Sequence, residues 1–362
     1  MARVILVVRG EVNISPTITN YLVALTKLGY EVHCICSSVK VPLENVKYHF
    51  AGMGVHNNVL KKLYGYWDFG VKAKKILVSL NISKSDIVWV SRIDTALCLN
   101  SFPKNVTSVL ALHELHDSYP FWIKITGWVI KNYTKVVYNE ANRAQIARVM
   151  YGLKALPTVI PNKPSEHPLK KKLPIKNSSL SDLVLQLNNK KVIIYQGSLQ
   201  SDRSIEELVK ATANLDSSYV LLIMGKDPEG KIPTFKAINP SLVYIPWVVP
   251  PDHLNITSHA YIGVAFYDTD CLNSIYCAPN KIWEYSGFGV PVLGQDIPGL
   301  IETIEKNGYG KCVDINDEHA ILDAIKYIDK NYETLSLNAS EFYRSVDFEK
   351  ELQKLLGSVF DD

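Results

Sequence analysis

Residues 278–294 read APNKIWEYSGFGVPVLG, and this stretch indicates how the chain is built. Pro279 suits the first turn of a helix, where the missing N–H of proline has no function. Gly287 and Gly289 are expected to end that helix, and the apolar run 291–293 is typical of a short buried strand. A helix, a glycine turn and a buried strand in succession predict an α/β fold.

The same alternation runs along the whole chain, in two sets separated by a polar, lysine-rich linker at 163–190. In the first set we expect strands at 4–8, 31–36, 46–50, 87–91, 108–112, 135–138 and 158–160, and helices at 16–28, 58–79, 119–131 and 139–150. In the second we expect strands at 192–196, 219–224, 243–245, 261–265, 290–293 and 311–314, and helices at 204–214, 251–257, 279–286, 298–306 and 317–329. The pattern predicts two doubly wound Rossmann-like domains facing a central cleft, at 1–170 and 171–342.

Composition is that of a globular protein: 362 residues, 47% hydrophobic and 21% charged. The opening residues MARVILVVRG predict a strand and a glycine turn, and they contain no apolar run of the length of a signal peptide or a membrane span. The six cysteines lack zinc-type spacing, so we expect reduced thiols in a cytoplasmic protein. Charge is uneven, because residues 1–170 hold 21 basic and 10 acidic side chains against 18 and 26 in the rest. The basic half indicates an anionic partner.

Two common nucleotide motifs are missing from the sequence. No G-x-G-x-x-G follows the first expected strand, and no G-x-x-x-x-G-K-[ST] occurs. The sequence therefore does not favour dinucleotide redox chemistry or P-loop phosphoryl transfer. Asp268-Thr269-Asp270 matches the D-x-D pattern of some metal-dependent sugar transferases, but short acidic loops are frequent by chance. We expect no metal and no cofactor.

The helix at 279–286 carries the chemistry of a nucleotide-sugar site. Lys281 and Glu284 are three residues apart and project from one helix face. A helix N-terminus with a lysine in its first turn favours a diphosphate, and the carboxylate one turn on can bind sugar hydroxyls. The plain alternative is a solvated surface with a weak ion pair.

Several segments, in order, resemble GT-B glycosyltransferases, above all the large retaining family four. YQGSLQSDRSIEELVKA at 195–211 is similar to the first strand, turn and helix of the family's donor domain, and 278–294 is similar to its second signature. VIPN at 159–162, DIPGL at 296–300 and the closing segment 347–358 agree as well. The resemblance implies that a last helix, at 343–362, crosses back onto the first domain. The Pro-Asn-Lys variant of the signature is similar to bacterial surface-polysaccharide transferases.

The resemblance also implies residue roles in donor binding. Glu284 falls on the second glutamate of the signature, which binds ribose hydroxyls in the family, whereas Tyr276 stands in place of the first glutamate. Arg203 falls on the usual phosphate-binding lysine, and Ser198 stands where an arginine is common. The expected donor-binding set comprises Gly10, Gly197, Ser198, Arg203, Tyr276, Cys277, Ala278, Asn280, Lys281 and Glu284.

The first domain is expected to supply the acceptor side. Gly10 and Glu11 follow the first strand, where a glycine turn lets a ligand approach the backbone closely. His113 and Glu114 follow a later strand, and an imidazole or a carboxylate there can contact the transferred sugar or take the acceptor proton. The candidate catalytic residues are therefore His113, Glu114 and Glu11, although a histidine simply packed at a strand end is a common alternative.

Segments 58–79 and 119–135 mix aromatic residues with lysines and contain little acid. A helix of this kind can lie on an anionic bilayer, although a core-facing aromatic stripe is an equally simple interpretation. We expect a cytoplasmic protein that contacts the inner face of the cell membrane. Nucleic acid is not expected as a partner, because no binding motif accompanies the charge.

Taken with the resemblance, these features predict a metal-independent, retaining glycosyltransferase of bacterial cell-surface polysaccharide synthesis. Its donor would be a nucleoside diphosphate sugar, and its acceptor a hydroxyl of a glycan or a lipid-linked acceptor. Two alternatives stay open at this point. One is another GT-B enzyme, either an inverting transferase or a nucleotide-sugar epimerase. The other is an inactive glycosyltransferase-like partner or scaffold protein, which the missing first glutamate would favour.

Overall fold

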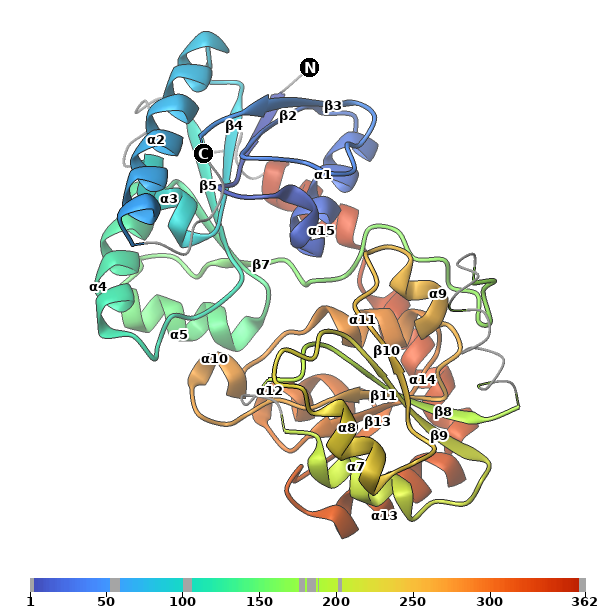
Figure 1. Ribbon diagram of the computed structural model, residues 1–362. Helices are drawn as coiled ribbons and strands as arrows, with labels where there is room; N and C mark the ends of the chain where they lie inside the picture. The colour runs from blue at the N-terminus through green and yellow to red at the C-terminus, as the bar shows by residue number, and fades with distance from the viewer. Residues whose placement is uncertain are drawn as a thin grey trace. The chain divides into compact units, whose positions relative to one another are not determined.

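The computed structural model describes residues 3–52, 59–99, 106–175, 180, 187, 189–200 and 204–357. The chain divides into two compact units, one made of Met1–Glu166 and Asp347–Asp362 and the other of His167–Val346. Each unit is built around a parallel sheet (Figure 1).

The first unit has a seven-stranded sheet in the order β3-β2-β1-β4-β5-β6-β7. Its strands are β1 (Arg3–Val7), β2 (Glu31–Cys36), β3 (Val46–Phe50), β4 (Ile87–Ser91), β5 (Thr107–Leu112), β6 (Lys135–Tyr138) and β7 (Thr158–Val159). Its helices are α1 (Pro16–Lys27), α2 (Val59–Ser79), α3 (Ile93–Leu99), α4 (Pro120–Val129), α5 (Ala141–Tyr151) and α15 (Phe348–Gly357), with short helical turns at Val12–Ile14 and Ile130–Asn132.

Alternation along β1 explains why this sheet is covered on both faces. Val4 and Leu6 pack with α1 and α15, whereas Ile5 and Val7 pack with the cluster that contains Phe69 of α2. Successive side chains of a strand point to opposite faces, so a strand buried on both sides is apolar throughout. The last helix therefore belongs to the core of the first unit.

The second unit has a six-stranded sheet in the order β10-β9-β8-β11-β12-β13. Its strands are β8 (Lys191–Gln196), β9 (Tyr219–Met224), β10 (Val243–Ile245), β11 (Ile262–Ala265), β12 (Val292–Gln295) and β13 (Gly310–Val313). Its helices are α7 (Glu206–Ala213), α8 (Ile232–Ile238), α9 (His253–Thr257), α10 (Leu272–Ile275), α11 (Asn280–Gly287), α12 (Pro298–Leu300, continued by a wider turn at Ile301–Glu305), α13 (Glu318–Lys330) and α14 (Tyr332–Ser345).

Helices also cover both faces of the second sheet. One buried cluster joins it to α9, α11 and α14, and the other joins it to α7, α8 and α13 (Figure 1). The prediction of two doubly wound parallel sheets is confirmed. The sequence interpretation missed the helices α3, α8, α10 and α14. It also treated 343–362 as one helix, whereas α14 ends at Ser345 and α15 begins at Phe348.

Candidate functional site

The predicted residues fall into two groups, one at the carboxyl edge of each sheet. In the second unit, Glu284 lies in the middle of α11 and is buried. His253 Nε2, from the start of α9, lies 3.2 Å from Glu284 Oε1. Gln196 Nε2, from the end of β8, donates a hydrogen bond to Glu284 Oε2. Thr257 Oγ1 donates in turn to Gln196 Oε1 at 2.9 Å. Three elements thus fix the position of this carboxylate.

The partners of Glu284 decide its charge. Burial by itself would raise the pKa of Glu284, but the charge of His253 and the hydrogen bonds from His253 and Gln196 outweigh it, so the pKa is lowered. For His253, burial would lower the pKa, but the carboxylate of Glu284 outweighs it and the pKa is raised. Each partner therefore favours the charged form of the other, a carboxylate on Glu284 and an imidazolium on His253. A buried carboxylate of this kind can accept hydrogen bonds from sugar hydroxyls.

Lys281 lies one turn before Glu284 and is also buried. Its Nζ lies 4.9 Å from the centre of the Tyr195 ring and 5.1 Å from that of Tyr267. Aromatic faces attract an ammonium group within about 6 Å, so the two rings hold the cation at the start of α11. Asn280 is the first residue of this helix, and Pro279 before it has no side-chain acceptor with which to cap the first N–H groups.

Tight backbone packing surrounds this edge. A Cβ on Gly225, just after β9, would lie 1.8 Å from the carbonyl oxygen of Gly197. Gly197 itself has a φ of 153° and donates its N–H to Met224 O at 2.9 Å. Ser198 follows and is half-buried, with its carbonyl oxygen 3.3 Å from the Tyr195 hydroxyl. Neither glycine accepts a side chain in this arrangement.

The DIPGL segment has a comparable role in packing. A Cβ on Gly299 would lie 3.0 Å from the backbone of residues 275–277, so a glycine lets this backbone approach α12. Tyr276 and Ala278 are half-buried here, and Cys277 is buried. They lie between α10 and α11, where the signature was expected. Arg203 falls outside the described residues, so its predicted phosphate contact stays a prediction.

In the first unit, Gly10 follows β1 with a φ of 127°. Glu11 is close by, and its Oε1 lies 3.1 Å from Lys40 Nζ. His113 follows β5, and burial, with Arg92 and Arg143 adding to it, lowers its pKa to about 4. His113 is thus a neutral imidazole at physiological pH, which suits a hydrogen-bonding role better than that of a strong base. Glu114 is exposed.

Metal ligands do not gather in the described part of the chain. Within residues 3–52, 59–99, 106–175, 180, 187, 189–200 and 204–357, no group of three or more histidine, cysteine, aspartate or glutamate side chains could hold a metal ion. Asp270 of the D-x-D pattern accepts a hydrogen bond from Ser274 Oγ at 3.3 Å. That contact gives the acidic loop a local structural role.

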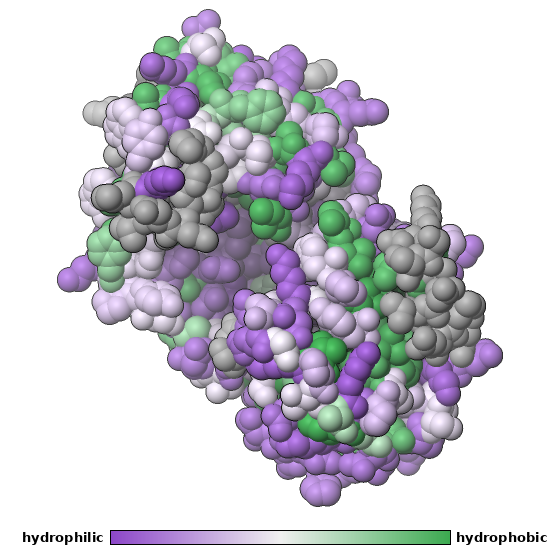
Figure 2. Space-filling model, in the orientation of Figure 1, coloured by the Kyte–Doolittle hydropathy of each residue, from purple (hydrophilic) through white to green (hydrophobic). Residues whose placement is uncertain are grey.

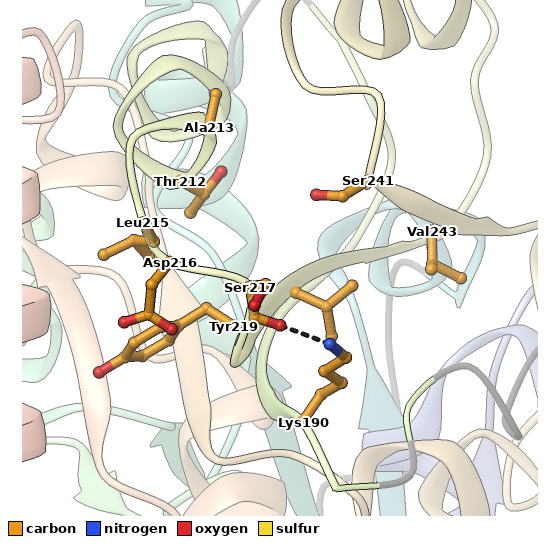
Figure 3. Close-up of a pocket in the computed structure, with 10 residues that line it drawn as sticks. Lys190, Thr212, Ala213, Leu215, Asp216, Ser217, Tyr219, Ser241 and Val243 are labelled. Carbon is orange, nitrogen blue, oxygen red and sulfur yellow. Dashed lines mark hydrogen bonds between the residues drawn. The ribbon is translucent and has the colours of Figure 1, made fainter.

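A separate pocket lies at the amino-terminal edge of the second sheet (Figure 3). Its walls include Lys190, Asp216, Ser217 and Tyr219, and Lys190 Nζ donates a hydrogen bond to the carbonyl of Ser217. None of the predicted site residues is among those that line it. Ligands of open α/β sheets bind at the carboxyl edge, so this pocket belongs to the wrong edge for a donor site.

The structure adds residues that the sequence interpretation missed. His253 and Thr257 of α9, together with Gln196, surround Glu284 although they are 27 to 88 residues away in the chain. Tyr195 and Tyr267 do the same for Lys281. Local spacing carried no signal for any of these contacts. His253 follows a Pro-Pro-Asp turn, and a single histidine in that position is typical of the start of any surface helix.

Comparison with known proteins relates this chain to a protein family and to solved structures. Residues 190–331 match the family described as glycosyl transferases group 1. No curated protein sequence matches the chain. The fold is similar to sucrose-phosphate synthase from Thermosynechococcus elongatus, with a TM-score of 0.75, 16% identity and 100% of each chain covered. It is also similar to Anabaena HepE in complex with UDP, with a TM-score of 0.72, 14% identity and coverage of 99% and 100%.

A third similar structure is the lipopolysaccharide outer core galactosyltransferase WaaB, with a TM-score of 0.66, 13% identity and coverage of 98% and 99%. The fold is thus that of GT-B proteins, which confirms the predicted fold class. The family match adds that the second unit is similar to a glycosyltransferase domain. Together these findings support nucleotide-sugar glycosyl transfer as the class of activity.

Proposed function

We propose that the chain is a metal-independent, retaining glycosyltransferase that acts in bacterial cell-surface polysaccharide synthesis. It moves a sugar from a nucleoside diphosphate to a hydroxyl of a glycan or of a lipid-linked acceptor. The observation that carries the proposal is the carboxylate of Glu284, which is buried and held between His253 and Gln196 at the carboxyl edge of the second sheet. This carboxylate lies within the segment that matches group 1 glycosyltransferases.

Donor binding divides between the two charged residues of α11. Glu284 accepts hydrogen bonds from the ribose hydroxyls, because its rotamer and charge are already set before the ligand arrives. Lys281 and the N-terminus of α11 attract the diphosphate. Fixed cations of this kind stabilise a departing nucleoside diphosphate in place of a metal ion.

Retention of the anomeric configuration is what the resemblance to family four implies, with the acceptor attacking from the face that the leaving phosphate occupies. With a tyrosine at position 276, the donor helix supplies no obvious enzymic nucleophile, which is compatible with that route. The departing phosphate takes the acceptor proton in that route, while His113, neutral at physiological pH, acts as a hydrogen-bond donor and not as the base. An NMR assay of the anomeric proton in the first-formed product tests this part, since an inverted product contradicts it.

Calorimetry with a panel of nucleoside diphosphates and their sugars, with and without EDTA, tests donor binding. Glu284→Ala should weaken binding about ten- to a hundredfold, as expected for a lost hydrogen bond to a charged group. Glu302→Ala is the matched control, because that glutamate is about half exposed and pairs with Lys306 within its own helical turn. Loss of binding in EDTA contradicts metal independence. Binding that is equal in wild type and Glu284→Ala contradicts the assigned donor site.

Membrane contact is the part of the proposal that concerns localisation. In the described residues no helix is long and apolar enough to cross a membrane. The first unit instead exposes Leu63, Tyr64 and Trp67 on α2, each more than half accessible. Phe121 and Trp128 on α4 are likewise exposed. Both helices contact α3, and Figure 2 shows apolar and hydrophilic residues interspersed over the region where Figure 1 draws them.

Exposed lysines accompany these aromatics on both helices, among them Lys74, Lys75 and Lys124. Aromatic side chains beside lysines suit the interface of an anionic bilayer. Co-sedimentation with phosphatidylglycerol vesicles, against phosphatidylcholine vesicles, should show selective binding that Trp67→Ala and Trp128→Ala reduce. Leu337→Ala is the control, because Leu337 is equally exposed on α14 of the second unit. Equal binding of all variants contradicts this surface.

A further inference from the structure

Arg9 is the most deeply buried charged side chain at the carboxyl edge of the first sheet, with 2% of its surface exposed. It lies just beyond β1, and its guanidinium carbon is 4.0 Å from the centre of the Tyr66 ring. Nη2 lies 3.6 Å from Asp94 Oδ2, too far for a good hydrogen bond. Nε and Nη1 are buried and donate to no atom of the described chain. Buried polar groups are nearly always paired, so two donor nitrogens without a partner on one guanidinium indicate a missing acceptor.

Arg92 brings a second guanidinium to the same place. It follows β4, which pairs directly with β1 in the sheet. Its Nη2 lies 3.1 Å from Asp94 Oδ2, the same oxygen that Arg9 approaches. One carboxylate therefore faces two guanidinium groups, and the cluster keeps an excess positive charge.

The backbone of Arg92 shows that its side chain is held there against local preference. Its φ is 75°, in the left-handed region that disfavours any residue with a Cβ. Asn45, Asn81 and Asn189 also have positive φ, but asparagine tolerates this conformation, and Leu169 and Lys172 share it in the segment between the two sheets. Strained residues of this kind are concentrated at functional sites, where the side chain is needed at one particular position.

His113 completes the cluster from the next strand. It follows β5, which pairs with β4, and Arg92 is among the charges that lower its pKa. Both ring nitrogens are buried, and neither forms a hydrogen bond with any residue that the structure describes. A neutral imidazole therefore offers one N–H donor here. Gly10 leaves room beside Arg9, because no described atom lies within 4 Å of where its Cβ would be.

The acidic groups nearby do not fill this role. Glu114 is exposed, and the pKa of His116 is lowered mainly by burial although Glu114, Asp94 and Asp117 act against that shift. Asp94 is already shared between Arg9 and Arg92. The unfilled donors thus point to an anion that the described residues do not supply.

We propose that Arg9, Arg92 and His113 form a subsite for a phosphate or diphosphate group carried by the acceptor. The inference rests on the proposed function, since it takes the first unit to be the acceptor side. Guanidinium groups match phosphate geometry and bind it through paired hydrogen bonds. The donors of two arginines and one imidazole fit a group with several equivalent oxygens better than they fit a neutral sugar hydroxyl. A sugar phosphate and a lipid-linked sugar diphosphate both present this chemistry.

The test is a calorimetric titration of inorganic phosphate and of pyrophosphate into the full chain. The main variant is Arg92→Gly, because glycine accepts the left-handed backbone and removes the charge. We expect its affinity to fall at least tenfold while its melting temperature stays equal to or above that of the wild type. Arg9→Lys, which keeps one charge but loses the planar donors, should also weaken binding. Exposed Arg148→Ala controls for net charge and should bind as the wild type does. Lys281→Ala should lose at most the pyrophosphate that binds at the donor edge, and it should keep the affinity that Arg92→Gly loses.

Full affinity in Arg92→Gly, or loss of affinity in Lys281→Ala instead, overturns the inference. The inference is also overturned if the wild type shows no saturable binding up to about 10 mM, which corresponds to a binding free energy weaker than roughly 3 kcal/mol. Competition by glucose 6-phosphate identifies a soluble sugar phosphate, and competition by vesicles that contain a polyprenyl diphosphate identifies a lipid-linked source. The titration needs no nucleotide. A chain that binds nucleotide but no phosphate therefore contradicts this inference alone, and one that binds phosphate but no nucleotide contradicts the proposed function.

Discussion

The carboxyl edges of the two sheets differ in how fully their polar groups are paired. At the second edge, Glu284 has partners on both oxygens and the backbone at Gly225 is packed too tightly for a Cβ. At the first edge, Arg9 keeps two donors without an acceptor in the described chain and Gly10 faces open space. A fully paired site is rigid before its ligand arrives, whereas a site with orphan donors is completed by the ligand. Under the proposed function, the difference fits a preorganised donor edge and an acceptor edge that an anion completes.

The largest expected effect separates the two edges by their glycines. Gly225→Ala should destabilise the fold by about 3 kcal/mol or more, because its Cβ would meet the Gly197 carbonyl at 1.8 Å. Gly10→Ala should cost only about 1–2 kcal/mol, the strain of its φ of 127° without a clash. Urea unfolding measures both. Equal losses would show that the two edges are equally tight.

The next effect concerns the pair that holds the donor carboxylate. His253→Gln and Glu284→Gln, combined in a double-mutant cycle, should show a coupling of about 1–3 kcal/mol in the free energy of unfolding. His259→Gln is the matched control, because His259 lies just beyond α9 and its Nε2 contacts the Leu173 carbonyl instead. A coupling near zero between His253 and Glu284 would mean that solvent, and not this pair, satisfies the carboxylate.

Measuring the free energy of unfolding against pH distinguishes the two edges further. The acid range concerns His113 at the first edge. The folded pKa of His113 is about 4, below the usual 6.5, so the unfolded chain takes up the proton first as pH falls. The free energy of unfolding should therefore decrease from pH 6.5 to about 4 in the wild type, and His113→Gln should remove that component. Chemical denaturation at each pH gives the slope. An NMR titration that places the His113 pKa near 6.5 would contradict the burial argument.

The smallest effect is expected on the alkaline side, at the second edge. The folded pKa of His253 is raised by Glu284, so its contribution to stability is complete below 6.5 and is lost as pH rises through the raised value. Glu284 works in the opposite sense, because its lowered pKa makes its contribution fade only in acid. His253→Gln should therefore flatten the decrease in stability above pH 6.5, and it should also change the acid side, because His253 lowers the pKa of Glu284. Parallel alkaline slopes in both proteins would refute the ion pair.

Much of the fold could be predicted from the sequence. The apolar runs that become β4 and β9 have the bounds that the sequence indicated. Parallel strands buried on both faces are apolar throughout, so each leaves a local signal. The helices α3, α8 and α14 gave weaker signals, since they are short or carry many polar residues, and their helical state depends on packing against neighbours.

The sequence indicated which helix carries the candidate site, but it indicated few of the side-chain contacts there. Lys281 and Glu284 could be named from one helix because their spacing is local, and their roles stay predictions that the proposed variants test. His253, Gln196 and Thr257 could not be linked to Glu284, since nothing in a linear pattern states which strand end faces which helix. The type of side chain determines which chemistry a residue can perform, whereas its charge state depends on burial and on its partners.

The sequence alone thus specifies two parallel sheets and most of their helices, because strand and helix periods are local properties, and it leads to the prediction that Glu284 binds a ribose. Tertiary structure decides that Glu284 is an anion held by His253, and that Asp94 is shared by Arg9 and Arg92. These outcomes depend on side chains 31 and 85 residues apart meeting in a buried environment. Electrostatic energies there are set by distance and desolvation, which exist only once the chain has folded.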